Sequence, residues 1–152
     1  MSSPLARLAE LGINLPPVPA PVAAYIPARR SGSFVYTSGQ VPIVDGALQM
    51  TGKVGAEVSA EDAAGLARIA ALNALAAVHE LVGLDTVVGV VKVVGYVASA
   101  PDFTGQPAVI NGASGLLGEV FGDAGAHARS AVGVAALPLD APVEVELIVE
   151  VR

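Results

Sequence analysis

Hydrophobic and polar residues alternate along two segments near the end of this 152-residue chain, residues 129–137 and residues 143–151. A period of two is typical of a strand that exposes one of its faces. The residues between them, Pro138-Leu-Asp-Ala141, are expected to form the connection. Upstream, residues 85–98 are rich in β-branched side chains and predict a third strand.

Two longer apolar segments have helical spacing. The first is predicted to begin after Ser59, a favourable N-cap residue, and to end at Gly83. The second covers residues 107–121. A short amphipathic helix is predicted at residues 5–11, and the prolines of residues 16–21 predict an extended lead-in after it.

Two further strands are predicted before the long helix. Residues 33–38 favour a strand, and Asp45-Gly46 is a hairpin-turn signal that leads into residues 47–50. The order β-β-α-β-α-β-β predicts an α+β fold: one domain over residues 1–152, with a mixed sheet and both helices on one face. Residues 1–21 would be an N-terminal extension of that domain.

The last two predicted strands are expected to pair as a hairpin. If Leu137 lies opposite Pro142, Arg129 lies opposite Glu150, and its level is about 20 Å from that of Glu144. Arg129 and Glu144 then share the sheet face away from the helices and can cooperate only across a subunit boundary. The same face would carry Ala131, Gly133, Ala135 and Ile148. Because this surface is too apolar to stay bare, a closed homo-oligomer is predicted.

Composition narrows the class of function. The chain is 53% hydrophobic and 14% charged, and its net charge of −6 argues against binding to nucleic-acid phosphates. It has no Cys and two His, which excludes thiolate metal sites, cysteine nucleophiles and disulfides. The apolar segment 63–82 contains charged residues and is not expected to span a membrane. No targeting segment is recognised, so a cytoplasmic protein is predicted.

The residue that most suggests chemistry is Arg129, at the mouth of a strand rich in Ala and Gly. A guanidinium can hold a planar carboxylate through two hydrogen bonds, and Glu144 could orient a water. The alternative is that Arg129 is a solvated charge at a strand end and Glu144 a polar residue of the outer face. The sequence pattern alone leaves both interpretations open.

Other polar features are given structural interpretations. His127 is interpreted as a loop histidine rather than an acid, and Arg29 and Arg30 as solvated loop residues rather than a second anion site. Asn73 is expected to bond buried backbone. The glycines at 112, 115 and 118 are expected to allow close packing, because no phosphate-loop Lys follows them.

Three segments resemble the RidA family, also called YjgF/YER057c/UK114. They are Tyr36-Thr-Ser-Gly-Gln-Val-Pro42, the helix that contains Asn73, and Ala128-Arg-Ser-Ala-Val-Gly-Val-Ala-Ala-Leu-Pro138 with Val143-Glu-Val-Glu146. The resemblance covers about residues 22–152 and is closest to a longer branch of that family. It implies a chorismate-mutase-like fold and a homotrimer with three clefts between subunits.

The resemblance also implies an activity that needs no cofactor and no metal: hydrolysis of reactive 2-imino acids, such as 2-aminoacrylate and its imine tautomer, to 2-keto acids and ammonia. Arg129 would bind the substrate carboxylate, and Glu144 would orient or deprotonate the attacking water. Catalysis would depend on orientation and proton transfer.

Five further positions match the cleft of the family. Tyr25 matches a cleft tyrosine, Ser38 and Gly39 match the cleft wall, and Ala131 matches a position whose backbone contacts the ligand. Asn111 matches a cleft asparagine, with a spacing to Arg129 that differs by one residue. Two alternatives stay open: a non-catalytic binder of small carboxylates, and an interaction or regulatory protein, including the ribonuclease activity reported for relatives.

Overall fold

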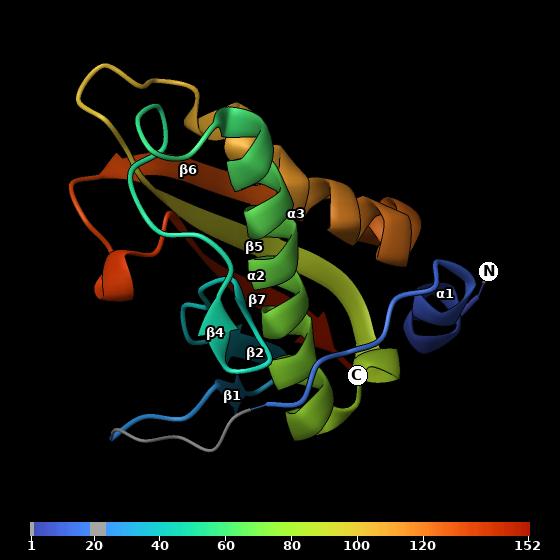
Figure 1. Ribbon diagram of the computed structural model, residues 1–152. Coiled ribbons are helices and arrows are strands. Elements are labelled where there is room, and N and C mark those ends of the chain that lie inside the picture. Colours follow the sequence, from blue (N-terminus) through green and yellow to red (C-terminus); the bar gives the residue numbers. More distant parts are fainter. Residues whose placement is uncertain (1, 19–23) are drawn as a thin grey trace.

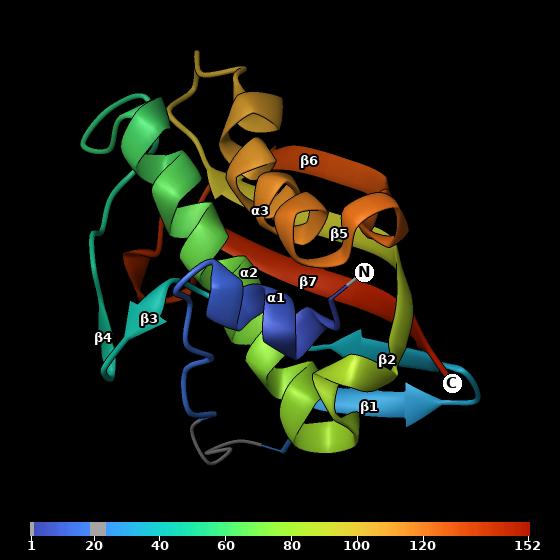
Figure 2. The same ribbon diagram turned by 90° about the vertical axis from the view of Figure 1, so that its right-hand side faces the viewer.

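The computed structural model describes residues 2–18 and 24–152, so part of the predicted lead-in at residues 16–21 lies outside the described residues. A mixed five-stranded sheet has the strand order β1-β2-β7-β5-β6, with both long helices packed on one of its faces (Figures 1 and 2). The strands are β1 Ala28–Ser31, β2 Phe34–Thr37, β5 Val87–Ala98, β6 Ala128–Val134 and β7 Val143–Val151. The helices are α1 Pro4–Glu10, α2 Ala60–Val82 and α3 Gln106–Phe121. A separate hairpin joins β3 Ile43–Val44 to β4 Ala47–Leu48, and 3₁₀ turns follow α2 (η1, Leu84–Thr86), α3 (η2, Gly122–Gly125) and β6 (η3, Pro138–Asp140).

The predicted α+β fold with two helices on one face of a mixed sheet is confirmed. The strand predicted at residues 47–50 is only the short β4 of the separate hairpin, and β1, which was not predicted, completes the sheet instead. The Ser59 hydroxyl accepts a hydrogen bond from the amide of Asp62 at 3.1 Å and caps α2, and Gly83 ends that helix with φ 80°. The two helices lie side by side over the sheet and enclose the core between the two layers (Figure 2). By length and composition α2 could cross a membrane, but half of that stretch is buried inside the fold, as expected of a core helix.

The predicted hairpin of the last two strands is wrong, because β5 lies between them. β6 pairs with β5 in parallel, with Arg129 beside Val93, and β7 pairs with β5 antiparallel, with Glu144 beside Tyr96. A parallel pair needs a crossover connection, and α3 supplies it between β5 and β6. The long apolar β5 is thereby flanked by a strand on each side, whereas β6, which is rich in Ala and Gly, is an edge strand of the sheet.

The predicted alternation along β6 has the correct period, but its two sets of residues lie on the opposite faces of the sheet from those predicted. Arg129 shares its face with Val93, which is fully buried beneath the helices, and so points towards α3. Ala131 and Gly133 lie on the same side, and not on the open face as predicted. The open face instead carries Tyr36, Val94, Val132 and Ile148. It remains substantially apolar, but of the residues predicted for it only Ile148 is among these four.

The arginines at 29 and 30 lie in a strand rather than a loop. β1 pairs antiparallel with β2, with Arg29 beside Tyr36, and forms the sheet edge opposite β6. Both side chains are exposed, and Arg30 donates from Nε to the carbonyl of Gly32 at 3.0 Å. The pattern of only four residues, mostly polar, gave no strand signal.

Two polar or small residues of the helices have the structural roles expected of them. Asn73 donates from Nδ2 to the carbonyls of Val41 and Ile43, which ties the start of β3 and the residues just before it to α2. Gly112 lets α3 approach α2, because a Cβ there would lie on the carbonyl oxygen of Ala64. For Gly115 and Gly118 the packing explanation is wrong, since a Cβ at either position would meet nothing within 4 Å.

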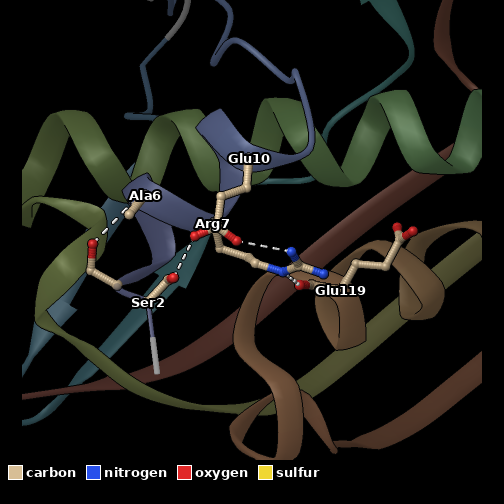
Figure 3. A network of polar contacts seen from close by, with 6 residues as sticks. Ser2, Ala6, Arg7, Glu10 and Glu119 are labelled. Atoms are coloured by element: carbon tan, nitrogen blue, oxygen red, sulfur yellow. Dashed lines mark hydrogen bonds and ion pairs between the residues drawn. The ribbon is translucent and has the colours of Figure 1, made fainter.

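The N-terminal helix α1 docks against the end of α3. Leu8 is buried, and Arg7 donates from Nε to the carbonyl of Glu119 at 2.9 Å and from Nη1 to Glu10 at 3.0 Å (Figure 3). The amide of Leu5 donates to the carboxylate of Asp85, which precedes β5. The predicted short helix at residues 5–11 is therefore present at Pro4–Glu10 and packs on the fold.

Candidate functional site

One group of the predicted site residues gathers where β2 and β7 diverge. The pairing of Tyr36 with Ile148 continues beyond the end of β2 as a bridge between Gln40 and Val145, so β2 carries one extra residue. Such a bulge re-aims the side chains beside it. It brings the backbone of Gly39 against Glu144: a Cβ on residue 39 would lie 2.6 Å from Oε2 of Glu144.

The hydroxyl of Thr37 closes the gap that the bulge leaves in the ladder. Thr37 is buried, and its Oγ1 accepts a hydrogen bond from the amide of Leu147 at 2.9 Å. A buried amide without a partner would cost about 1–3 kcal/mol. The Thr-Ser-Gly sequence at residues 37–39 thus supplies both the replacement acceptor and the residue small enough to lie against Glu144.

Ser38 fixes the segment that carries Tyr25. Its hydroxyl donates to the carbonyl of Ile26 at 2.6 Å, and its amide donates to the carbonyl of Pro27 at 2.8 Å. Tyr25, which precedes this anchor, is 61% exposed. The structure therefore places Tyr25, Ser38, Gly39 and Glu144 in one neighbourhood at the rim of the sheet.

Glu144 is surrounded in a way that favours its protonated form. Partial burial raises the pKa of its carboxyl above the usual value, and the negative charge of Glu146 raises this pKa further. Glu146 itself accepts a hydrogen bond from the hydroxyl of Tyr96 at 2.8 Å, and this bond raises the pKa of Tyr96. A carboxyl with a raised pKa is better suited to exchange a proton near neutral pH.

A second group of predicted residues surrounds Arg129 on the other side of the sheet. Nη1 donates to Oδ1 of Asn111 at 2.8 Å and to Oγ of Ser114 at 3.2 Å. Nη2 donates to the carbonyl of Pro107 at 3.4 Å. These three acceptors recur along one face of α3, so the helix holds the guanidinium at the edge strand. Asn111, which was matched to a cleft asparagine of the family, thus contacts Arg129 directly.

His127 belongs to the same group and is not a solvated loop histidine. It is half-buried, and both ring nitrogens have partners: Nδ1 lies 2.6 Å from the carbonyl of Gly125, and Nε2 lies 2.9 Å from Oγ of Ser114. Sequence reasoning missed Ser114 entirely. Two signals were available, since Ser114 falls three residues after Asn111 on a helix and His127 two residues before Arg129.

The two groups do not meet within one chain. Arg129 and Glu144 lie on opposite faces of the sheet, because Val93 and Tyr96, their neighbours on β5, are three residues apart. Three residues along β5 and two strand spacings place their Cα atoms about 14 Å apart. Ala131 lies near the Arg129 group, beside Gly95 and packed against the core.

Two hollows on the described part of the chain have other residues in their walls. One of about 540 Å³ adjoins the end of β6 and the residues before α3, and a smaller one of about 120 Å³ lies on the open face. Neither is lined by Arg129 or Glu144. Within residues 2–18 and 24–152, no cluster of three or more His, Asp or Glu side chains could hold a metal ion.

Comparison with known proteins identifies relatives over nearly the whole chain. Residues 5–151 match the model of the family described as "YjgF/chorismate mutase-like, putative endoribonuclease". Protein TCP17 of Trypanosoma cruzi is 44% identical over 149 residues, which are 97% of this chain and 93% of that protein. The crystal structure of protein Atu1372 from Agrobacterium tumefaciens has 44% sequence identity and a TM-score of 0.90, and the match covers 97% of this chain and 91% of that one. E. coli TdcF, crystallised with bound serine, has 27% identity and a TM-score of 0.63, with coverage of 89% and 93%.

Proposed function

The chain belongs to the YjgF/chorismate mutase-like family, also known as the RidA family, and on that premise we propose that it hydrolyses reactive 2-imino acids of the 2-aminoacrylate type to 2-keto acids and ammonia. The observation that supports this proposal is the pattern of hydrogen bonds made by the Arg129 guanidinium. Helix α3 holds its Nη1 through two hydrogen bonds, while Nε has no acceptor among the described residues. Donors thus remain for a carboxylate. The serine bound to E. coli TdcF is a small molecule of that class.

We propose further that the working site forms between protomers of a homotrimer, from Arg129 of one protomer and Glu144 of the next. Three observations support this arrangement. Arg129 and Glu144 lie on opposite faces of the sheet within one chain. β6 is an edge strand whose outer side has no partner strand within the described residues. The open face exposes Tyr36 and Val132, which contact between protomers would cover.

The reaction then needs one water, both of whose protons pass from oxygen to nitrogen by way of Glu144. Arg129 orients the substrate through its carboxylate, so that the adjacent imine carbon faces the water held by Glu144. Glu144 takes a proton from the water as the oxygen bonds to the imine carbon and the C=N electron pair moves to nitrogen. That proton returns to the nitrogen and gives a carbinolamine. Glu144 then takes the hydroxyl proton of the carbinolamine as the carbonyl forms and the C–N bond breaks with its electron pair on nitrogen. The same proton passes to that nitrogen, and ammonia leaves. Orientation and proton transfer are the contributions that the protein makes.

The test is an assay in which 2-aminoacrylate is generated enzymatically and release of the keto acid is followed. The wild-type chain should accelerate release, and Arg129→Ala and Glu144→Ala should each remove most of that acceleration. Arg68→Ala is the matched control, because Arg68 is a partly exposed arginine that pairs with Glu119. Full activity in Arg129→Ala would overturn the proposal.

A second candidate is non-catalytic binding of small carboxylates at the same residues. The serine bound to TdcF favours it, because serine is held there as a ligand. Thermal stabilisation by serine or pyruvate that depends on Arg129, without acceleration of keto-acid release, would establish this function in place of the deaminase.

A further inference from the structure

A hydrogen-bond chain with a fixed direction runs from the backbone to the guanidinium of Arg129. The carbonyl of Gly125 can only accept, so Nδ1 of His127 carries the proton in their 2.6 Å hydrogen bond. In the neutral imidazole Nε2 is then an acceptor, and the Ser114 hydroxyl, 2.9 Å away, donates to it. The Ser114 oxygen is left to accept from Nη1 of Arg129.

These hydrogen bonds determine which edge of the Arg129 guanidinium is available to a ligand. A guanidinium has five N–H donors. The acceptors Asn111 and Ser114 occupy both hydrogens of Nη1, and the carbonyl of Pro107 takes one hydrogen of Nη2 through a long contact. Among residues 2–18 and 24–152, Nε and the second hydrogen of Nη2 have no acceptor. Nε–H and its neighbouring Nη2–H are the parallel pair that can hold a carboxylate side-on.

The support behind His127 is built into the backbone. A Cβ on residue 125 would lie 2.4 Å from the carbonyl oxygen of Leu117, so only glycine lets η2 fold this closely against α3. This approach places the Gly125 carbonyl where His127 can donate to it. The tautomer of His127, and through it the direction of the Ser114 hydroxyl, is therefore set by main-chain packing.

We propose that Ser114 and His127 are positioning residues for Arg129: they hold Nη1 against α3, so that Nε and Nη2 face the ligand and the site takes a monocarboxylate side-on. This inference rests on the proposed role of Arg129 as the carboxylate clamp. Ser114 acts on the guanidinium directly, and His127 acts through Ser114. Neither residue is placed in contact with the substrate.

The first test measures pyruvate affinity by calorimetry. Ser114→Ala should weaken binding about tenfold, the order expected for one hydrogen bond to a charged group, while Ser114→Thr keeps the hydroxyl and should restore most of the affinity. His127→Phe should weaken binding in the same direction, and Ser33→Ala, at a remote turn serine, should leave it unchanged. In an Arg129→Lys background Ser114→Ala should have no further effect, because its partner guanidinium is gone. An equal loss in both backgrounds would overturn the positioning role.

The second test does not depend on any ligand. Nitrogen NMR of the wild-type protein should show His127 protonated at Nδ1, and separate Nη1 and Nη2 signals for Arg129 because rotation of the guanidinium is hindered. In Ser114→Ala the two Nη signals should merge. Merged signals in the wild type, or proton occupancy at Nε2, would overturn the inference. If the wild type shows hindered rotation of the guanidinium but does not bind pyruvate, the hydrogen bonds to Arg129 are present but Arg129 does not bind a carboxylate. That outcome would reject the proposed role of Arg129.

Discussion

The backbone of Gly39 lies directly against the carboxylate of Glu144, with room for a hydrogen atom but not for a methyl group, which would sit 2.6 Å from Oε2. The contact exists because the bulge after β2 shifts residues 38 and 39 relative to β7. Residue 39 therefore controls where the carboxylate of Glu144 lies. This relationship links a local irregularity of the sheet to the proposed base.

Replacing Gly39 with Ala should displace the Glu144 carboxylate and lower kcat for keto-acid release about tenfold or more. The thermal midpoint should change little, because the obstructing atoms are the far end of a flexible side chain. Thermal unfolding and steady-state kinetics on the same preparation separate the two effects. Unchanged kcat would show that the observed position of Glu144 is not needed for turnover.

Glu144 should reduce stability as pH rises. Its pKa is raised in the folded chain, so the folded state binds more protons than the unfolded state and stability falls as pH rises through the raised pKa. In the proposed cleft Arg129 of the neighbouring protomer opposes this shift, so the comparison belongs in an Arg129→Ala background. There, Glu144→Gln should raise the thermal midpoint at pH 7 and have no effect below about pH 4, where the carboxyl of the unfolded chain is already protonated. Equal midpoints at pH 7 would contradict the burial effect.

The sequence predicts where the strands and helices lie better than which strands pair with one another. The two-residue period of 143–151 locates β7 correctly, and that of 129–137 locates β6 but runs past its end at Val134. Alternation depends only on local backbone geometry, so it can be recognised in the sequence. Which strand each one pairs with depends on β5, whose long apolar surface needs a strand on both sides. The choice of partner strand therefore depends on residues far away in the sequence. The short connection between β6 and β7 gives no indication that β5 lies between them. The side of the sheet that Arg129 occupies was predicted wrongly for this reason.

The candidate site shows the same division. Residue type alone suggested Arg129 and Glu144 as candidate groups. Their separation within one chain was predicted for the wrong reason, because they were expected on one face of a hairpin and lie on opposite faces of the sheet. The Ser114–His127 contact was not predicted, since it depends on the turn η2 returning the chain against α3 at Gly125. Residues that meet through such a turn carry no fixed spacing in the sequence.

The glycines of α3 offer a matched pair of substitutions. Gly112→Ala should destabilise the chain by about 1–3 kcal/mol or more, because its Cβ would overlap the carbonyl of Ala64 on α2, and two packed helices cannot yield easily. Gly115→Ala should instead stabilise it by about 0.5–1 kcal/mol, since a helical glycine is replaced in open space. Urea unfolding of both variants measures the difference. Similar effects at the two positions would contradict the close approach of the helices at Gly112.

The last prediction concerns the open face of the sheet. Val132 is 43% exposed there and shares the face with Val94 and Tyr96, on the side away from both helices. In the proposed trimer this face is covered, and a charge placed on it would have to lose its water on assembly. Val132→Asp should therefore convert the trimer into monomers, as measured by analytical ultracentrifugation at micromolar concentration. Its unfolding transition should stay cooperative, because the core between sheet and helices is untouched.

The control and the consequence for activity follow from the same geometry. Leu139→Asp changes a side chain that is 71% exposed in the turn η3, outside the strands of the sheet, and should leave the trimer intact. If the site needs Arg129 and Glu144 from different protomers, the Val132→Asp monomer should lose keto-acid release even though both residues are present in each chain. A monomer with full activity would show that one chain brings the two residues together by another movement. A wild-type protein that is itself monomeric would remove the intersubunit site, because the structure keeps Arg129 and Glu144 on opposite faces.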